Sequence, residues 1–381
     1  MGTAYIVDAV RSPLARVAKG KSELSGVRPD ELAAAVLRAL VARTGIDPAT
    51  IEDVVMGCVT PVGEQGLNIG RMAALVAGFP VDVTGTTVNR MCGSSQQALN
   101  FAAMGCASGF QDLVIAGGVE CMSRVPMGSD MFLNGAMAEM SPELTWRYSI
   151  VPQGQSAELV AQRYQLGRDA LDAFSVESHR RAAAAQDGGA FDREIVAIGE
   201  VSRDDGIRRG STVADLAKLK PAFREDGVVT AASSSQITDG AAAVLVASER
   251  AVKEYGLRPR AKIIAMATAG CDPTIMLTAP VPATRKALAQ AGLSVKDLDA
   301  IEINEAFASV ALGCGQALGL EPDKTNRHGG AIALGHPLGA SGARLVATLL
   351  GVLEASGGRF GLSTMCIGFG QGIATIIDRD V

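Results

Sequence analysis

Three residues with reactive side chains lie in separate glycine-rich blocks of the sequence. Cys92 belongs to VNRMCGSSQQAL, His336 to HGGAIALGHPLGASGAR and Cys366 to MCIGFGQG. A thiolate attacks carbonyl carbons, and an imidazole is a suitable base for the proton of the thiol. A second thiol can exchange a proton with a substrate carbon. A nucleophile, a base and a second thiol together indicate thioester chemistry.

Cys92 is expected at the junction between an apolar strand and a helix of small residues. Backbone N–H groups and the dipole at a helix N-terminus favour a thiolate over a thiol. The alternative interpretation is a buried structural cysteine, because free cysteines are usually buried. The segment Gly93-Ser94-Ser95 that follows favours the catalytic interpretation, because small residues allow a close approach of the backbone.

The chain has three histidines, and their surroundings differ. His336 stands between Gly335 and Pro337, just before a helix expected to start near Gly339, and this rigid placement suits a catalytic base. The alternative is a core histidine with satisfied hydrogen bonds. His179 lies on a charged helix face and is expected to be solvated, whereas His328 opens a glycine turn and is expected to be structural.

Two further residues are candidates for binding an oxyanion. Gly368 follows Cys366 by two residues, and its backbone N–H is a suitable donor to a developing negative charge. Asn304 lies in NEAFA, where a strand is expected to end and a helix to begin. Its amide can bind an oxyanion directly or through water, and the alternative role is a helix N-cap. Cys366 itself has the alternative of a structural residue in a glycine-rich turn.

Alternating strand and helix patterns predict a parallel or mixed sheet that is covered by helices. The segment from about residue 119 to residue 238 is richer in loops, and it is predicted as an insertion that holds two helices. The expected strands are 4–10, 53–59, 84–88, 112–116, 241–247 and 261–267, and the expected helices are 29–44, 93–107, 156–165 and 168–186.

An internal repeat links the two reactive regions. TGIDPATIEDVVMG, which starts at Thr44, resembles AGLSVKDLDAIEIN, which starts 247 residues later at Ala291. The same offset places Cys92 opposite Gly339, close to His336, and it places the strand predicted at 112–117 just before Cys366. We therefore expect Cys92 and His336 in related turns of two duplicated halves. The alternative is a chance similarity of two unrelated strand–helix units.

Length and composition exclude several classes of protein. A chain of 381 residues exceeds the usual limit of about 250–300 residues for a single core. The net charge of −5 argues against nucleic-acid binding, and the absence of a long uncharged apolar run argues against a membrane span. Seven cysteines without a C-x-x-C spacing argue against disulfides and structural zinc, and they favour a reducing cytoplasm.

Taken together, the VNRMC, NEAF, GHPLGASGAR and CIGFGQG blocks resemble the thiolase family, and the resemblance covers essentially the whole chain. It implies an α/β thiolase fold, in which two βαβαβαββ halves form a five-layered α-β-α-β-α core with an inserted loop domain. The implied boundaries are 1–118 and 239–260 for the N-terminal half, 119–238 for the CoA-binding loop domain, and 261–381 for the C-terminal half.

The resemblance also implies a mechanism. Cys92 would attack the keto carbon of a 3-ketoacyl-CoA while His336 takes its proton, and Cys366 would protonate the acetyl-CoA enolate that leaves. One oxyanion hole would use His336 and a water held by Asn304, and the other would use the N–H groups of Cys92 and Gly368. Coenzyme A is then a substrate, and no metal or further cofactor is expected.

Contacts with coenzyme A are implied for five residues that match family positions. They are Arg208, Phe223, Ser235, Met276 and Phe307. For Arg208, the alternative is a solvated surface charge.

Departures from the family pattern bear on the substrate. Ser95 and Gln96 replace a glycine and a leucine, Pro152-Gln153-Gly154 replaces H-M-G, and Phe369 replaces a glycine. Leu277-Thr278-Ala279 also departs from the usual glycine-containing stretch. These changes favour a degradative enzyme for a bulky, branched or ring-derived 3-ketoacyl-CoA over a biosynthetic acetoacetyl-CoA thiolase.

Other interpretations remain open. A 3-ketoacyl-CoA hydrolase would use water in place of coenzyme A, and an acyl-CoA- or sterol-binding protein would have no activity.

The resemblance implies a homodimer or homotetramer, with residues 84–88 and 68–71 as candidate interface elements.

Overall fold

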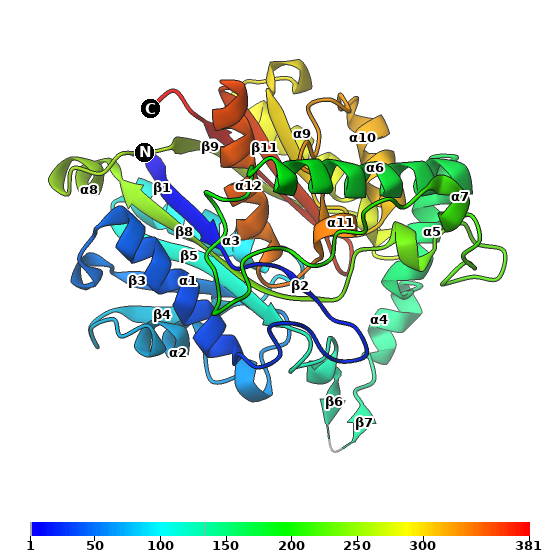
Figure 1. Cartoon of the computed structure of the whole chain (residues 1–381), viewed down its shortest axis with the longest axis horizontal. Coiled ribbons are helices and arrows are strands. Elements are labelled where there is room, and N and C mark those ends of the chain that lie inside the picture. The colour runs from blue at the N-terminus through cyan, green and yellow to red at the C-terminus, as the bar shows by residue number, and fades with distance from the viewer. Residues whose placement is uncertain (1, 134) are drawn as a thin grey trace.

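The computed structural model describes residues 2–133 and 135–381, and one ten-stranded sheet organises most of them (Figure 1). Strands run along the sheet in the order β4-β3-β5-β8-β1-β9-β12-β11-β10, and the short β2 (Ala15–Arg16) pairs with β8. Only three residue pairs join β1 to β9, from Ala4↔Ile263 to Ile6↔Ala261. This narrow junction divides the sheet into an N-terminal and a C-terminal half.

The N-terminal half has parallel strands at its outer edge and antiparallel strands toward the junction. β3 pairs in parallel with β4 and β5, and β8 pairs antiparallel with β5 and β1. Its strands are β1 (Ala4–Arg11), β3 (Asp53–Gly57), β4 (Thr84–Val88), β5 (Leu113–Cys121) and β8 (Thr238–Ser248).

The C-terminal half repeats this arrangement. β10 pairs in parallel with β11, while β12 pairs antiparallel with β11 and β9. Residues 324–326 complete the pattern beside β10, because Ile301 donates its N–H to Lys324 and accepts one from Asn326, both at 2.8 Å. The strands are β9 (Ala261–Gly270), β10 (Ala300–Ile303), β11 (Phe360–Ile367) and β12 (Gln371–Asp378).

The repeat predicted from sequence is confirmed by this topology. An offset of 247 residues relates the first residue of β3 to that of β10, the first residue of β5 to that of β11, and the first residue of α3 (Ser94–Ser108) to that of α12 (Ser341–Ser356). The predicted α/β fold with duplicated halves is therefore correct.

Helices α3 and α12 form the central layer, between the strands of the two halves (Figure 1). One buried cluster joins Leu99 of α3 and Leu350 of α12 to Val244 of β8 and Ile377 of β12. A helix that is apolar on all sides belongs in a core, and most residues of α12 are buried. At the crossing, a Cβ on Gly342 would overlap the backbone of Gln96.

Outer helices cover the other face of each half. α1 (Pro29–Thr44) has Pro29 in its first turn and ends at Gly45 in the left-handed conformation, as its sequence predicts. Its buried residues pack with Ile115 and Leu245, and α9 (Pro280–Ala291) packs on β9 and β12 in the same way. The remaining helices of the two halves are α2 (Ile69–Val76), α8 (Glu249–Glu254), α10 (Ala308–Leu318) and α11 (Ala331–Leu334).

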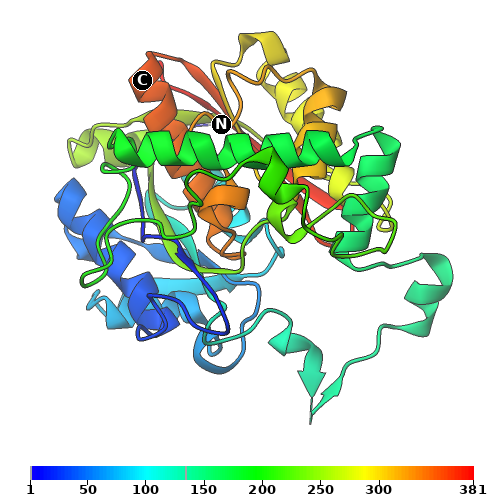
Figure 2. The same cartoon turned by 45° about the vertical axis from the view of Figure 1, so that its right-hand side comes forward.

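The segment between β5 and β8 forms the predicted insertion. Its elements are β6 (Phe132–Leu133), β7 (Ala136–Met137), α4 (Pro142–Arg147), α5 (Gln153–Arg163), α6 (Arg168–Asp187) and α7 (Val213–Leu216). Figure 2 shows β6, β7 and α4 in an arm that extends away from the sheet and its helices. α5 starts three residues before its predicted start. The exact domain boundaries stay a prediction, and residues 1 and 134 fall outside the described part.

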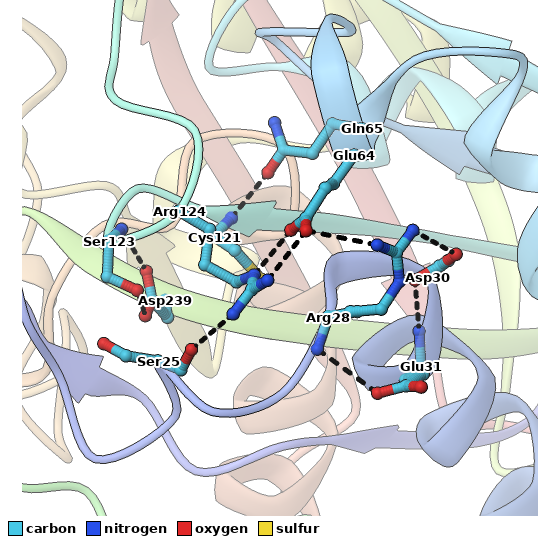
Figure 3. A network of polar contacts seen from close by, with 10 residues as sticks. All are labelled: Ser25, Arg28, Asp30, Glu31, Glu64, Gln65, Cys121, Ser123, Arg124 and Asp239. Atoms are coloured by element: carbon cyan, nitrogen blue, oxygen red, sulfur yellow. Dashed lines mark hydrogen bonds and ion pairs between the residues drawn. The ribbon is translucent and has the colours of Figure 1, made fainter.

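Ion pairs fix the point where this arm leaves β5. Arg124 binds Glu64 through two hydrogen bonds of 2.5 and 2.7 Å, and Glu64 also accepts one from Arg28 at 3.1 Å (Figure 3). Gln65 accepts the N–H of Cys121 at 2.7 Å. In the range 2–133 and 135–381, no helix is long and apolar enough to cross a bilayer.

Candidate active site

Cys92 lies in a tight turn between β4 and α3. Met91, the preceding residue, has a φ of +46°, which is unusual for a residue with a side chain. Ser94 stabilises the turn by accepting the N–H of Arg90 at 2.9 Å and donating to the carbonyl of Met91 at 2.6 Å. A Cβ on Gly93 would overlap Ile367, so this glycine lets the end of β11 pack directly against the turn.

The environment of the Cys92 thiol differs from the prediction. Burial raises its pKa to about 11, and the negative charge of Glu120 acts in the same direction. Hydrogen bonds from the N–H of Cys92, the N–H of Gly368 and the side chain of Gln153 lower the pKa, but they do not outweigh burial. The expectation of a resting thiolate is therefore wrong, because the free-energy cost of desolvating a buried thiolate exceeds the stabilisation from the hydrogen-bond donors. Cys92 needs a base.

Cys366 and Gly368 lie beside Cys92, at the end of β11. Burial raises the pKa of the Cys366 thiol well above its usual value, and the nearby Cys92 sulfur raises it further. Gly368 is in the tip of the β11–β12 hairpin, and its N–H reaches the Cys92 sulfur. The structure thus brings two protonated thiols and a backbone donor to one point.

His336 is held at both ring nitrogens. Nδ1 lies 2.5 Å from Oγ of Ser341, and Nε2 lies 3.3 Å from Nδ2 of Asn304. The Ser341 hydroxyl also donates to the carbonyl of Pro337 at 2.8 Å. A hydroxyl has one proton, so this second bond favours a tautomer in which Nδ1–H donates to Ser341 and Nε2 is free to accept a proton. Leu338, two residues after His336, packs in the same buried cluster as Cys92.

A buried ion pair lies behind His336. Arg344 and Glu302 are almost fully buried, with 3.5 Å between the guanidinium and the carboxylate. Burial first, and the positive charge of Arg344 second, lower the pKa of His336 to about 3. The imidazole is therefore neutral near pH 7 and able to accept a proton. Among the described residues, the guanidinium nitrogens of Arg344 and Oδ1 of Asn304 have no hydrogen-bond partner.

Asn304 does not start a helix, contrary to expectation. β10 ends at Ile303, and α10 begins only at Ala308 with Phe307 as its N-cap. The residue after Asn304 explains the intervening loop, because the buried Glu305 accepts hydrogen bonds from Ser178 at 2.6 Å and Asn326 at 2.9 Å. These bonds fix the backbone of the loop and leave the amide of Asn304 beside His336.

Glu120 connects the loop after β3 to the turn that carries His336, and no sequence motif marks this residue. This buried residue of β5 accepts N–H groups from Val59 at 2.9 Å, Thr60 at 3.1 Å and Gly339 at 2.9 Å. Gln65, which also binds Cys121 (Figure 3), donates to it at 2.8 Å. Its donors come from segments far apart in the sequence, so only the folded chain reveals them.

Four of the five predicted CoA contacts lie together. Phe223 packs edge to face on Phe307, with ring centroids 5.8 Å apart. Met276 and Phe307 belong to the same buried cluster as Cys366. Ser235 donates its backbone N–H to Ala306 at 2.9 Å, next to Phe307. These residues therefore line the side of the site that adjoins the inserted domain.

The fifth, Arg208, lies at a separate cavity of about 260 Å³ that also contacts Arg180, Arg209 and His179. His179 is buried, and its Nδ1 accepts the N–H of Arg208 at 3.1 Å. The expectation of a solvated His179 is wrong, because the loop that carries Arg208 covers that face of α6. Burial lowers the pKa of His179 to about 4.

Two residues that depart from the family pattern adjoin Gly368, Gln153 in space and Phe369 in the chain. Gln153 is the first residue of α5, its amide lies beside Gly368, and it lowers the pKa of the Cys92 thiol. Phe369 follows Gly368 and has a φ of +60°, a conformation that costs little for glycine and about 1–2 kcal/mol for other residues. Its ring is 43% exposed at the hairpin tip. The sequence indicated both positions only as changes that bear on the choice of substrate.

Comparison with known proteins gives a consistent result. The family model described as "Thiolase, N-terminal domain" matches residues 4–250, and "Thiolase, C-terminal domain" matches residues 257–379. The steroid 3-ketoacyl-CoA thiolase FadA6 of Mycobacterium tuberculosis is 46% identical over 100% of this chain and 95% of its own. A beta-ketoadipyl-CoA thiolase of Acinetobacter baylyi is 47% identical over 100% of both chains, and a 3-ketoacyl-CoA thiolase of Psychrobacter cryohalolentis is 48% identical over 98% of this chain and 97% of its own.

Proposed function

Because the chain belongs to the thiolase family and is an acyltransferase, we propose that it cleaves a 3-ketoacyl-CoA with coenzyme A in the degradative direction. One observation carries the proposal: two thiols, Cys92 and Cys366, meet beside the N–H of Gly368. The neutral His336 lies on the adjoining turn. A hydrolase needs one nucleophile and a base, whereas carbon–carbon cleavage also needs a group that protonates the departing carbanion.

The first half of the reaction forms an acyl-enzyme. His336 accepts the proton of Cys92 at Nε2, and the sulfur attacks the 3-keto carbon. The tetrahedral oxyanion collapses, the bond between C2 and C3 breaks, and acetyl-CoA leaves as an enolate. Cys366 donates its proton to C2 of that enolate. Its raised pKa supports this role, because it keeps the thiol protonated at neutral pH.

The second half transfers the acyl group to coenzyme A. The thiol of a second CoA loses its proton to the Cys366 thiolate and attacks the carbonyl carbon of acyl-Cys92. The N–H groups of Cys92 and Gly368 stabilise the oxyanion that forms. When this intermediate collapses, the sulfur of Cys92 leaves and takes back the proton that His336 has held. Asn304 and His336 bind the enolate oxygen in the first half. Every proton removed is returned, so coenzyme A is a substrate and no further cofactor is required.

The aromatic pair that Phe223 of the inserted domain forms with Phe307 of the C-terminal half suits the binding of coenzyme A. We assign Phe223, Phe307, Met276 and Ser235 to the pantetheine and the reactive end of the substrate. Arg208 lies at the cationic cavity with Arg180 and Arg209, and we assign it to the phosphates of the nucleotide. These charges attract phosphate groups.

The substrate is proposed as a bulky or ring-derived 3-ketoacyl-CoA. Two relatives of nearly half identity are named for steroid 3-ketoacyl-CoA and for beta-ketoadipyl-CoA. The exposed ring of Phe369 next to Gly368 supports the same class, because aromatic rings pack favourably on large apolar groups.

An assay of CoA-dependent cleavage tests the proposal. Acetyl-CoA release is measured from acetoacetyl-CoA, a long-chain 3-ketoacyl-CoA and a ring-bearing 3-ketoacyl-CoA, with Cys92→Ala as the control. Fast cleavage of the ring-bearing substrate, lost in the variant, is the expected result. Preference for acetoacetyl-CoA would contradict the substrate class. Product formation without free CoA would indicate a hydrolase, and no turnover of any substrate would indicate an acyl-CoA-binding protein.

We also propose a homodimer or homotetramer in the cytoplasm. β4 is an edge strand with exposed residues, and edge strands pair readily with a second copy. The arm exposes Met127, Phe132, Met137 and Trp146, the last at 83%, and such apolar patches are typical of interfaces. Sedimentation of the purified protein tests the assembly.

All seven cysteines are free thiols, which suits a reducing compartment such as the proposed cytoplasm.

A further inference from the structure

The side chain of Gln153 lies against the oxyanion-binding glycine. Its Nε2 is 3.4 Å from the place that a Cβ would occupy on Gly368, and Cγ of Met91 is 3.6 Å from the same place. Gly368 has no side chain, so the amide approaches its backbone directly. Gln153 and the turn that carries Cys92 therefore both adjoin the hairpin that carries Gly368.

The same amide reaches the nucleophile. Three groups lower the pKa of the Cys92 thiol, namely its own N–H, the N–H of Gly368 and the side chain of Gln153. The first two are the groups assigned above to the oxyanion of the acyl-enzyme. A third donor beside them is close to the atom on which negative charge develops.

Packing holds this amide in place. Gly154, the next residue, has no side chain, and a Cβ there would overlap the ring of Phe223. Phe223 in turn packs on Phe307. The N-terminus of α5 is thus fixed against the aromatic pair, so the donor needs little reorganisation when charge develops.

We propose that Gln153 is a further catalytic residue, whose Nε2–H donates to the Cys92 thiolate and to the oxyanion formed when coenzyme A attacks acyl-Cys92. This inference rests on the acyl-Cys92 pathway proposed above. Gln153 forms no covalent bond and transfers no proton. It stabilises the charge on the sulfur when Cys92 is deprotonated and again when the tetrahedral intermediate collapses and expels it.

Three variants test this role. Gln153→Met keeps the length of the side chain and removes the donor, Gln153→His restores an N–H, and Gln155→Met is the matched control on an exposed position of the same helix. Labelling of Cys92 by iodoacetamide is followed from pH 6 to pH 11 by mass spectrometry of its peptide, and kcat and KM for thiolysis are measured in parallel.

Loss of the donor lowers the reactivity of the thiol. We expect labelling of Gln153→Met at pH 8 to fall roughly tenfold, with a profile shifted to higher pH, because a hydrogen bond to a charged group is lost. We expect kcat to fall roughly 10- to 100-fold, while KM changes little. Gln153→His should retain most of both activities, and Gln155→Met should match the wild type.

Several results would overturn the proposal. A wild-type labelling profile in Gln153→Met would do so, and so would an equal loss in Gln155→Met. If Gln153→Met fails to fold, slow labelling of a folded Gln153→His variant would overturn the proposal instead. Labelling does not depend on the substrate, so a wild-type enzyme without thiolysis would contradict the proposed function alone and leave the contact between Gln153 and Cys92 open to this test.

Discussion

The turn that carries Cys92 and the turn that carries His336 occupy related positions in the two halves, but they are built differently. Both precede a central helix, α3 or α12, and in both the residue before the reactive one has a positive φ. In the first turn that residue is Met91 at +46°, and in the second it is Gly335 at +103°. The nucleophile therefore follows a strained residue, and the base follows a relaxed one.

Their side chains also differ in how they are held. The Cys92 sulfur faces donors from three different segments, whereas the His336 ring is fixed at both nitrogens by hydrogen bonds with Asn304 and Ser341. A nucleophile must form and break a bond, but a base has to keep one orientation and one tautomer through the cycle. Duplication supplied two equivalent positions, and their partners then diverged with the chemistry.

One property is common to both turns, because burial disfavours the charged form of each group. The pKa of the thiol is about 11 and that of the imidazole about 3, so a resting thiolate–imidazolium pair is strongly disfavoured. Charge therefore develops only when a substrate carbonyl is in place to accept the sulfur. This arrangement protects a buried thiol from unproductive reactions.

The comparison predicts the largest effect at Cys92. Replacement by Ala removes the atom that forms the covalent bond, so thiolysis should fall by about 10⁴-fold or more. His336→Gln should fall by only about 10²- to 10³-fold, because general base catalysis contributes that much. Rates at saturating substrate measure both, and the thermal midpoint of each variant serves as the control. Equal losses would show that the two turns contribute equally.

The next largest predicted effect is on stability, and it tests how the backbones of the two turns differ. Gly335 has φ 103° and ψ 168°, a region open to glycine alone, and a Cβ there would overlap Thr238, whose hydroxyl accepts the N–H of His336. Gly335→Ala should therefore destabilise the protein by about 3 kcal/mol.

Gly357 provides the matched control for that substitution. It ends α12 with a φ of +67° and has open space around a Cβ, so Gly357→Ala should cost only about 1 kcal/mol. Urea unfolding measures both variants. Similar losses at the two positions would mean that the packing of Gly335 against Thr238 adds nothing.

A smaller effect is expected at the hydroxyl that fixes the His336 ring. Ser341→Ala removes the partner of Nδ1, so the ring loses its preferred tautomer and kcat should fall roughly tenfold. Nitrogen-15 chemical shifts of labelled histidine should change from one tautomer to a mixture.

Ser356 is the control, because its hydroxyl also donates to a carbonyl four residues earlier in α12, at 2.8 Å, without a histidine nearby. Ser356→Ala should leave kcat unchanged. If Ser341→Ala shows unaltered nitrogen shifts, Ser341 does not set the tautomer.

The sequence located the reactive residues but not the groups that tune them. Cys92, His336 and Cys366 lie in short motifs, and the repeat at 247 residues placed their turns in related positions, because such patterns are local. The direction of the Cys92 pKa was predicted wrongly, since burial is a property of the whole fold. The donors to Glu120 and the cover over His179 come from segments far apart in the chain, so no local pattern reveals them.

The smallest predicted effect tests the strain before Cys92. Glycine is normally less stable than alanine in a folded chain, because it loses more conformational entropy. At Met91 the order should reverse, since a φ of +46° costs alanine about 1–2 kcal/mol and glycine almost nothing. Met91→Gly should therefore be more stable to urea than Met91→Ala by about 1 kcal/mol. Both variants remove the Met91 side chain beyond Cβ, which lies near Gly368, so their difference reports chiefly on the backbone. If the alanine variant is as stable as the glycine variant, the Cys92 turn carries no strain, and the contrast between the two turns is confined to their side chains.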